Sequence, residues 1–188
     1  MNADTALALE RGAVARREKR LDDARAAFAE AADSARKSGV LSDLAAALTN
    51  QAQIERDTGF LDKALAYQLD ALAIARGLNE PQNLAHVLRH VGDILQAANR
   101  HADADSYYRE MLALYRATPD TPPLDIANAV RSVALHAQNL GQKDEARRLW
   151  REARDRYATL DALFLSLTGS AENPGVKEAD RRLAALDA

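Results

Sequence analysis

The chain of 188 residues contains no cysteine, which excludes disulfide bonds and thiolate-based metal or redox chemistry. It also has no excess of basic residues, and its net charge of -3 leaves no basic footprint for nucleic acid. No apolar stretch is long enough to cross a bilayer, and the first residues, MNADTALALERG, lack the basic segment and apolar run of a signal peptide. These absences predict a cytoplasmic protein without nucleic-acid or membrane contacts.

Common catalytic and nucleotide-binding motifs are missing as well. The sequence has no G-x-x-x-x-G-K-[ST], no G-x-G-x-x-G and no G-x-S-x-G. Most carboxylates have a basic residue within one helical turn, as Glu152 has Arg156, which is typical of exposed helix pairs. The arginine-rich stretches 16–20 and 147–156 are interleaved with acids and favour solvated helix faces. We therefore expect a protein that is not an enzyme and needs no cofactor.

The feature that organises the chain is a repeat. Aromatics are only 5% of the residues, whereas alanine, the commonest type, allows helices to pack closely. An alanine recurs at spacings of 40, 40 and 42 residues, at Ala24, Ala64, Ala104 and Ala146. Four residues later stand Phe28, Gln68, Tyr108 and Trp150, and three further on Ala31, Ala71, Met111 and Ala153. This i, i+4, i+7 spacing places small, large and small side chains on one helix face.

A second helical pattern precedes each of these stretches, with a shared small position at Gly12, Ala52, Gly92 and Ala134. Left-handed helix ends are expected at Gly39, Gly59, Gly77 and Gly141. Ser42 is expected to cap the helix that follows it, and Pro81 fits a first helical turn. The prediction is an all-α domain over residues 1–158 with four antiparallel helix pairs, at about 3–38, 42–76, 81–117 and 124–158.

Residues 159–188 are predicted to be a linker and a C-terminal capping helix. Asn173 fits the cap of that helix and Pro174 its first turn, and an apolar stripe follows at Val176, Ala179, Leu183 and Leu186. The stripe is expected to cover the open end of the last helix pair. The alternative is a homodimer contact made by LFLSL (163–167) and this helix.

These shared positions resemble the tetratricopeptide repeat family. The fullest match is ALTNQAQIERDTGFLDKALAYQLDALAIAR (47–76), followed by VLRHVGDILQAANRHADADSYYREMLALYR (87–116). The usual period is about 34 residues, and the longer spacing here is similar to that of kinesin light chain repeats. The first repeat departs most, with Arg11 and Ala15 where a large apolar residue and an aromatic are common. The resemblance implies a right-handed α-solenoid that binds proteins or peptides.

In this family the first helix of each pair lines a concave surface. Carried over, the resemblance implies a binding set of Asn50, Gln53, Arg56, Asp57, His86, Arg89, His90, Asp93, Gln96, Asn128, Arg131, Ser132 and Gln138. Amides satisfy a peptide backbone and arginines fork onto carboxylates, so an acidic or C-terminal segment is the expected partner. The lysine-based clamp for chaperone C-termini is not expected, because Leu9, Ala13, His86 and His90 stand at four of its positions.

The stretch HVLRHVGD (86–93) leaves a further alternative open. His86, His90 and Asp93 fall on one side of a helix, as the ligands of a metal-dependent enzyme would. No H-E-x-x-H is present, and the other histidines belong to other helices. The remaining alternative is a structural self-association module. If the site is a peptide groove, protonation of the histidines near pH 6.5 is expected to strengthen binding to acidic partners.

Overall fold

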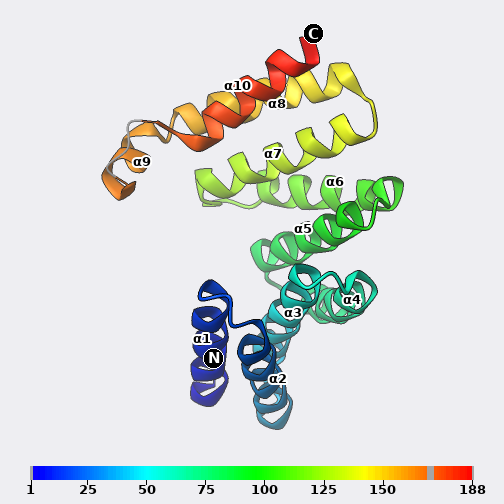
Figure 1. Cartoon of the computed structure of the whole chain (residues 1–188), viewed down its shortest axis with the longest axis vertical. Coiled ribbons are helices and arrows are strands. Elements are labelled where there is room, and N and C mark those ends of the chain that lie inside the picture. Colours follow the sequence, from blue (N-terminus) through cyan, green and yellow to red (C-terminus); the bar gives the residue numbers. More distant parts are fainter. Residues whose placement is uncertain (1, 169–171, 188) are drawn as a thin grey trace. The chain divides into compact units, whose positions relative to one another are not determined.

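The computed structural model describes residues 2–168 and 172–187, apart from the side chains at 163, 167 and 168. Every regular element in this part of the chain is a helix, and no strand occurs in it (Figure 1). The helices are α1 (Ala3–Arg17), α2 (Leu21–Ser38), α3 (Leu41–Asp57), α4 (Leu61–Gly77), α5 (Pro81–Ala97), α6 (His101–Ala117), α7 (Pro123–Asn139), α8 (Lys143–Ala158), α9 (Asp161–Thr168) and α10 (Pro174–Asp187). The predicted all-α class of repeated helix-turn-helix pairs is confirmed. None of these helices has both the length and the apolar character needed to span a membrane.

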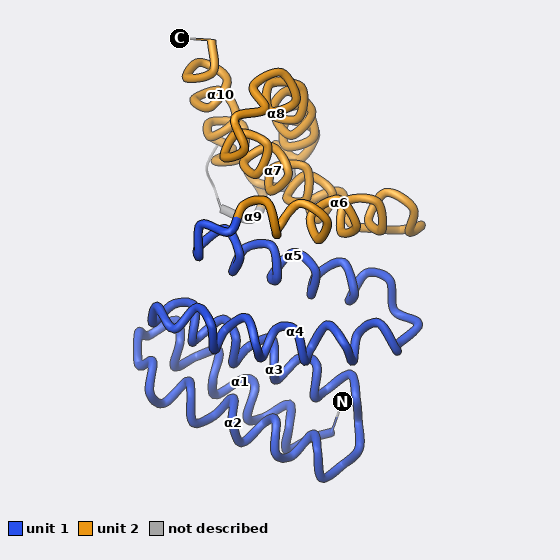
Figure 2. Tube along the Cα trace, turned by 90° about the vertical axis from the view of Figure 1, so that its right-hand side faces the viewer, with its two compact units in different colours: residues 1–100 blue, residues 101–188 orange. Residues whose placement is uncertain are grey.

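The chain divides into two compact units, residues 1–100 with α1 to α5 and residues 101–188 with α6 to α10 (Figure 2). In the first unit, α1 pairs with α2 and α3 with α4, while α2 packs on α3 and α4 on α5. In the second unit, α7 pairs with α8, α6 packs against α7, and α10 against α8. The boundary between the units falls between the two helices of the third predicted pair.

The shared small and large positions form the core of the first unit. Ala24, Phe28 and Ala64 are completely buried. The ring of Phe28 packs directly on α1 because Gly12 has no side chain; a Cβ at Gly12 would lie 2.4 Å from the ring. Gln68 occupies the large position of α4, and its amide nitrogen donates to a backbone carbonyl of α5 at 3.1 Å. This buried polar side chain is therefore hydrogen-bonded on its donor side.

The core of the second unit uses the same positions with larger side chains. Ala104 and Ala146 are fully buried, and Tyr108 and Trp150 fill the space beside them. The indole nitrogen of Trp150, on α8, donates to the amide oxygen of Gln138 on α7 at 3.2 Å. Gln138, one of the predicted binding residues, thus helps to hold the fourth pair together.

The turns inside the helix pairs repeat as regularly as the helices. Residues with left-handed backbone occur at Lys19, Gly59, Asn99 and Gly141, the same spacing as the shared alanines. Gly39 also has positive φ and ends α2. Two sequence predictions were wrong. Gly77 is not left-handed, because the chain leaves α4 through an extended residue. Ser42 is not a cap, because α3 already begins at residue 41.

The C-terminal segment covers α8 as predicted. Asn173 accepts a hydrogen bond from the backbone N–H of Gly175 at 3.0 Å, which confirms it as the cap of α10. Gly175 lies against the ring of Tyr157, and the stripe residues Ala179 and Leu186 are buried. The short helix α9 was not expected from the sequence. The side chains at 163 and 167, two positions of the predicted dimer contact, lie outside the described residues, as do residues 169–171.

Candidate functional site

In the first unit, polar side chains from α1, α3 and α5 form one hydrogen-bonded network. Arg16 on α1 reaches α3, where its Nε donates to Asp57 Oδ2 at 2.7 Å. The same guanidinium donates to the amide oxygen of Gln53. Because Arg16 holds this oxygen, the amide nitrogen of Gln53 is turned toward α5. There it lies 3.4 Å from Nε2 of His90.

His90 is the centre of this network, although only 6% of its surface is exposed. Its Nε2 atom lies 3.4 Å from Gln53 Nε2, 3.4 Å from Arg89 Nη2 and 3.1 Å from His86 Nε2. An amide NH₂ and a guanidinium can only donate, so Nε2 of His90 carries the lone pair and the ring proton sits on Nδ1. His86 Nε2 consequently donates as well. Three donors converge on one acceptor.

The surroundings of His90 keep it neutral. Burial, and to a smaller extent the charges of His86, Arg89, Arg56 and Arg16, together lower its pKa from 6.5 to about 2. Its Nδ1 is buried and has no hydrogen-bond partner among the described residues; Asp93 Oδ2 lies 3.9 Å away. The expectation that His90 would gain charge near neutral pH was therefore wrong. Although His90 belongs to the polar stripe of α5, its side chain is buried and not exposed to solvent.

The charges at the edge of the network are unequally paired. Arg56 lies 3.8 Å from Asp57 and 3.9 Å from Asp93, both of which are loose ion pairs. Arg89 contacts His90, and no carboxylate oxygen of the described residues lies within ion-pair distance of it. Three arginines and two aspartates belong to this cluster, so its formal charge is positive. An incoming anion meets donors here, chiefly from Arg89.

The donor set does not suit a metal ion. No group of three or more His, Asp or Glu side chains in the described part of the chain is arranged to hold one. The one lone pair of His90 that faces the cluster already accepts hydrogen bonds, and Arg16, Arg56 and Arg89 surround it. A cation at this point would be repelled by all three guanidinium groups.

Asn50 and Asp57 take part in a pocket beside the network, with a volume of about 570 Å³. Its other lining residues are Ala13, Arg16, Arg17, Lys19, Leu21 and Phe28. The side chain of Asn50 donates to a carbonyl of its own helix at 2.9 Å. Arg16, which lines this pocket and holds Gln53, stands 40 residues before Arg56, at the equivalent position of the preceding repeat.

The predicted residues of the second unit are engaged within the fold. Arg131 on α7 forms a bidentate ion pair with Glu178 on α10, with its Nε and Nη2 atoms at 2.6 and 3.0 Å from the two carboxylate oxygens. Asn128 accepts from the hydroxyl of Tyr157 at 2.7 Å. Ser132 is buried and donates to the carbonyl of Asn128, four residues earlier on its own helix. The sequence pattern of α7 alone gave no indication of Glu178, which comes from another helix.

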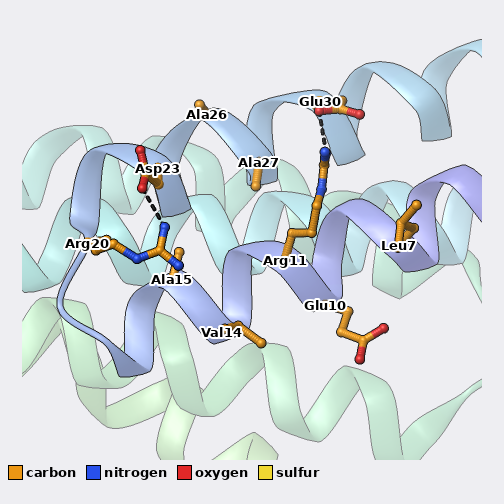
Figure 3. A pocket seen from close by; sticks show the side chains of 10 residues that line it. All are labelled: Leu7, Glu10, Arg11, Val14, Ala15, Arg20, Asp23, Ala26, Ala27 and Glu30. Carbon is orange, nitrogen blue, oxygen red and sulfur yellow. Dashed lines mark hydrogen bonds and ion pairs between the residues drawn. The ribbon is translucent and has the colours of Figure 1, made fainter.

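A second pocket, of about 600 Å³, lies between α1 and α2 (Figure 3). Its apolar lining is supplied by Leu7, Val14, Ala15, Ala26 and Ala27. The charged side chains at its rim pair with one another, Arg11 with Glu30 and Arg20 with Asp23. Because these charges are already neutralised, the pocket offers no unpaired arginine comparable to Arg89. This pocket was not expected from the sequence.

Comparisons with known proteins agree with the repeat pattern. Residues 43–117 match the family model described as tetratricopeptide repeat. No curated protein gives a significant sequence match. The chain is similar to the structure of a Rap protein complexed with competence and sporulation factor, at 17% identity and a TM-score of 0.74, covering 97% of this chain and 53% of that one. The chain thus spans about half the length of that protein.

Two further structures are similar. The apo form of RapI has 14% identity and a TM-score of 0.77, covering 97% of this chain and 69% of that one. A putative kinesin light chain from Podosopora anserina with nearly identical TPR-like repeats has 15% identity and a TM-score of 0.74, covering 99% and 87%. At these identities the likeness is one of fold.

Proposed function

Because the chain carries tetratricopeptide repeats, we propose that it is a non-catalytic scaffold that binds a protein or peptide partner. The proposed surface is the one formed by the first helices α1, α3 and α5. The observation that carries the proposal is the polar network in which side chains of three successive first helices meet around His90. A similar Rap protein is solved with competence and sporulation factor, which supports a partner-binding role for the fold.

The chemistry of this surface favours an acidic segment as the partner. Gln53 and the exposed His86 offer polar contacts for a peptide backbone, while Arg56 and Arg89 offer forked donors for carboxylates. Arg89 has no carboxylate partner in the described part of the chain, so binding need not break an existing ion pair there. We also propose that the chain binds this partner in the cytoplasm, the compartment expected from the sequence.

The test is an affinity capture with quantitative mass spectrometry, comparing wild type with Arg89→Glu. The control is Arg151→Glu, which reverses an exposed arginine on α8, a helix that is not part of the proposed surface. Proteins captured by wild type and by the control are expected to be lost with Arg89→Glu, while helical content and melting temperature stay nearly unchanged. An identical set of proteins on all three baits would place the binding surface elsewhere.

Self-association is the second candidate function, and one observation favours it. Leu165 on α9, which lies within the segment 163–167 expected to make the contact, is 50% exposed. A homodimer contact through this segment would cover it. Light scattering should then give twice the chain mass for wild type and the monomer mass for Leu165→Ser. A monomeric wild type at high concentration would remove this candidate.

A further inference from the structure

Arg131 shows what its position in the repeat can bind. Both carboxylate oxygens of Glu178 are held by its guanidinium, at 2.6 and 3.0 Å, in the two-pronged arrangement that makes arginine selective for carboxylates. Glu178 is only 16% exposed, and Arg182 lies 3.8 Å from it as a second cation. The position on α7 is thus a carboxylate receptor that the chain fills with its own C-terminal helix.

Arg89 stands 42 residues before Arg131, which is one repeat earlier, on the corresponding first helix α5. Its guanidinium makes one long contact, 3.4 Å to the lone pair of His90, and has no carboxylate partner among the described residues. Gln53 and His86 direct donors to the same lone pair. One neutral nitrogen cannot satisfy three donors well, because each approaches a single acceptor site. A carboxylate, with about four acceptor sites, would suit this arrangement better.

The neighbouring acids do not fill this place. Asp57 is held by Arg16 at 2.7 Å, and Asp93 lies 3.9 Å from Arg56. His90 is buried beneath these groups, and Arg89, Gln53 and His86 are held close together by their contacts with its Nε2 atom. The three donors come from α3 and α5, two helices that contact each other within the same unit.

We propose that Arg89, together with the amide of Gln53 and with His86, is an open carboxylate-binding subsite whose filled counterpart is the Arg131–Glu178 pair. The ligand is a carboxylate of the partner segment, from an acidic side chain or from a chain terminus. This inference rests on the proposed function and specifies how the partner is recognised. It also assigns different states to two equivalent arginines: Arg131 is filled from within the chain, and Arg89 receives its carboxylate from outside.

The test uses small probes and the intact chain. N-acetylglutamate N-methylamide is titrated into ¹⁵N-labelled protein, and the side-chain N–H signals of Gln53 and Arg89 are followed. The uncharged control probe is N-acetylglutamine N-methylamide. N-acetylalanine and N-acetylalaninamide form a second matched pair that reports on a terminal carboxylate. Saturable shifts are expected with the charged probe of at least one pair and not with its amide, which also identifies the source of the carboxylate.

Arg89→Gln should weaken binding of the charged probe at least about tenfold, and Arg151→Gln should leave it unchanged. Arg89→Lys keeps the charge but loses the fork, and is expected to fall between wild type and Arg89→Gln. Equal shifts with charged and uncharged probes, or unchanged affinity in Arg89→Gln, would overturn the subsite. If partner capture depends on Arg89 but the probes show no selective carboxylate binding, the proposed scaffold function is retained and the carboxylate subsite is refuted.

Discussion

The neutral, buried His90 predicts a specific pH dependence of stability. Its folded pKa of about 2 lies far below the ordinary value of 6.5 that it regains on unfolding. The unfolded chain therefore binds a proton that the folded chain does not, and stability is complete above pH 6.5 and falls as the pH drops below it. Between pH 7 and pH 5 this single group lowers the free energy of unfolding by about 2 kcal/mol. Because pH 5 is well above the folded pKa, the loss is set by the unfolded histidine alone.

The assay is urea unfolding of wild type and His90→Gln at pH 7 and pH 5. Glutamine has no proton to gain in this range, so the variant should lose about 2 kcal/mol less than wild type over the same interval. His136, whose pKa is also lowered by burial, is present in both proteins, and its contribution cancels in the difference. In wild type the ring signals of His90 should not shift with pH between 8 and 5. A titration of His90 near pH 6, or equal losses in both proteins, would refute the reasoning.

Two further predictions concern packing. Gly12→Ala should lower the free energy of unfolding by about 1–3 kcal/mol in urea titrations, because the new Cβ meets the buried Phe28 ring at 2.4 Å; Gly77→Ala, with no neighbouring atom within 4 Å, should cost nothing measurable. Glu178→Gln should accelerate hydrogen exchange in α10, because it breaks the largely buried ion pair with Arg131. The control Asp180→Asn removes an exposed ion pair with Arg154 and should leave the exchange rate unchanged. The reverse order in either comparison would contradict the assigned contacts.

The helical repeat was predictable because it depends on side-chain size at fixed spacing. Ala24, Ala64, Ala104 and Ala146 are all fully buried, so the period of the alanines identifies the packed face of each second helix. Gln68 is the exception, because the equivalent position of the other three repeats holds an aromatic side chain. Its hydrogen bond to α5 explains it, and that bond depends on a neighbouring helix whose placement no single-helix pattern specifies. Local periodicity thus predicts which face packs, but not how each polar exception is satisfied.

The candidate site was predictable only as a collection of residues. The amphipathic pattern of α5 placed His86, Arg89 and His90 on the same polar stripe, yet His86 is exposed and His90 is almost completely buried. The difference arises because Gln53 from α3 and its partner Arg16 from α1 close over His90. The tautomer of His90 and its lowered pKa follow from those same neighbours. None of this is encoded in the spacing along α5.

The same reasoning applies to the two equivalent arginines. In the sequence, Arg89 and Arg131 occupy the same position of consecutive repeats, and nothing in their own helices distinguishes them. Whether such an arginine is open or filled depends on the acids that other elements bring near it. Glu178 of α10 pairs with Arg131, whereas near Arg89 the carboxylate of Asp57 is held by Arg16 and that of Asp93 lies 3.9 Å from Arg56. A repeat can therefore keep one recognition chemistry at each period and still use it differently, to hold its own end in one copy and to receive a partner in another.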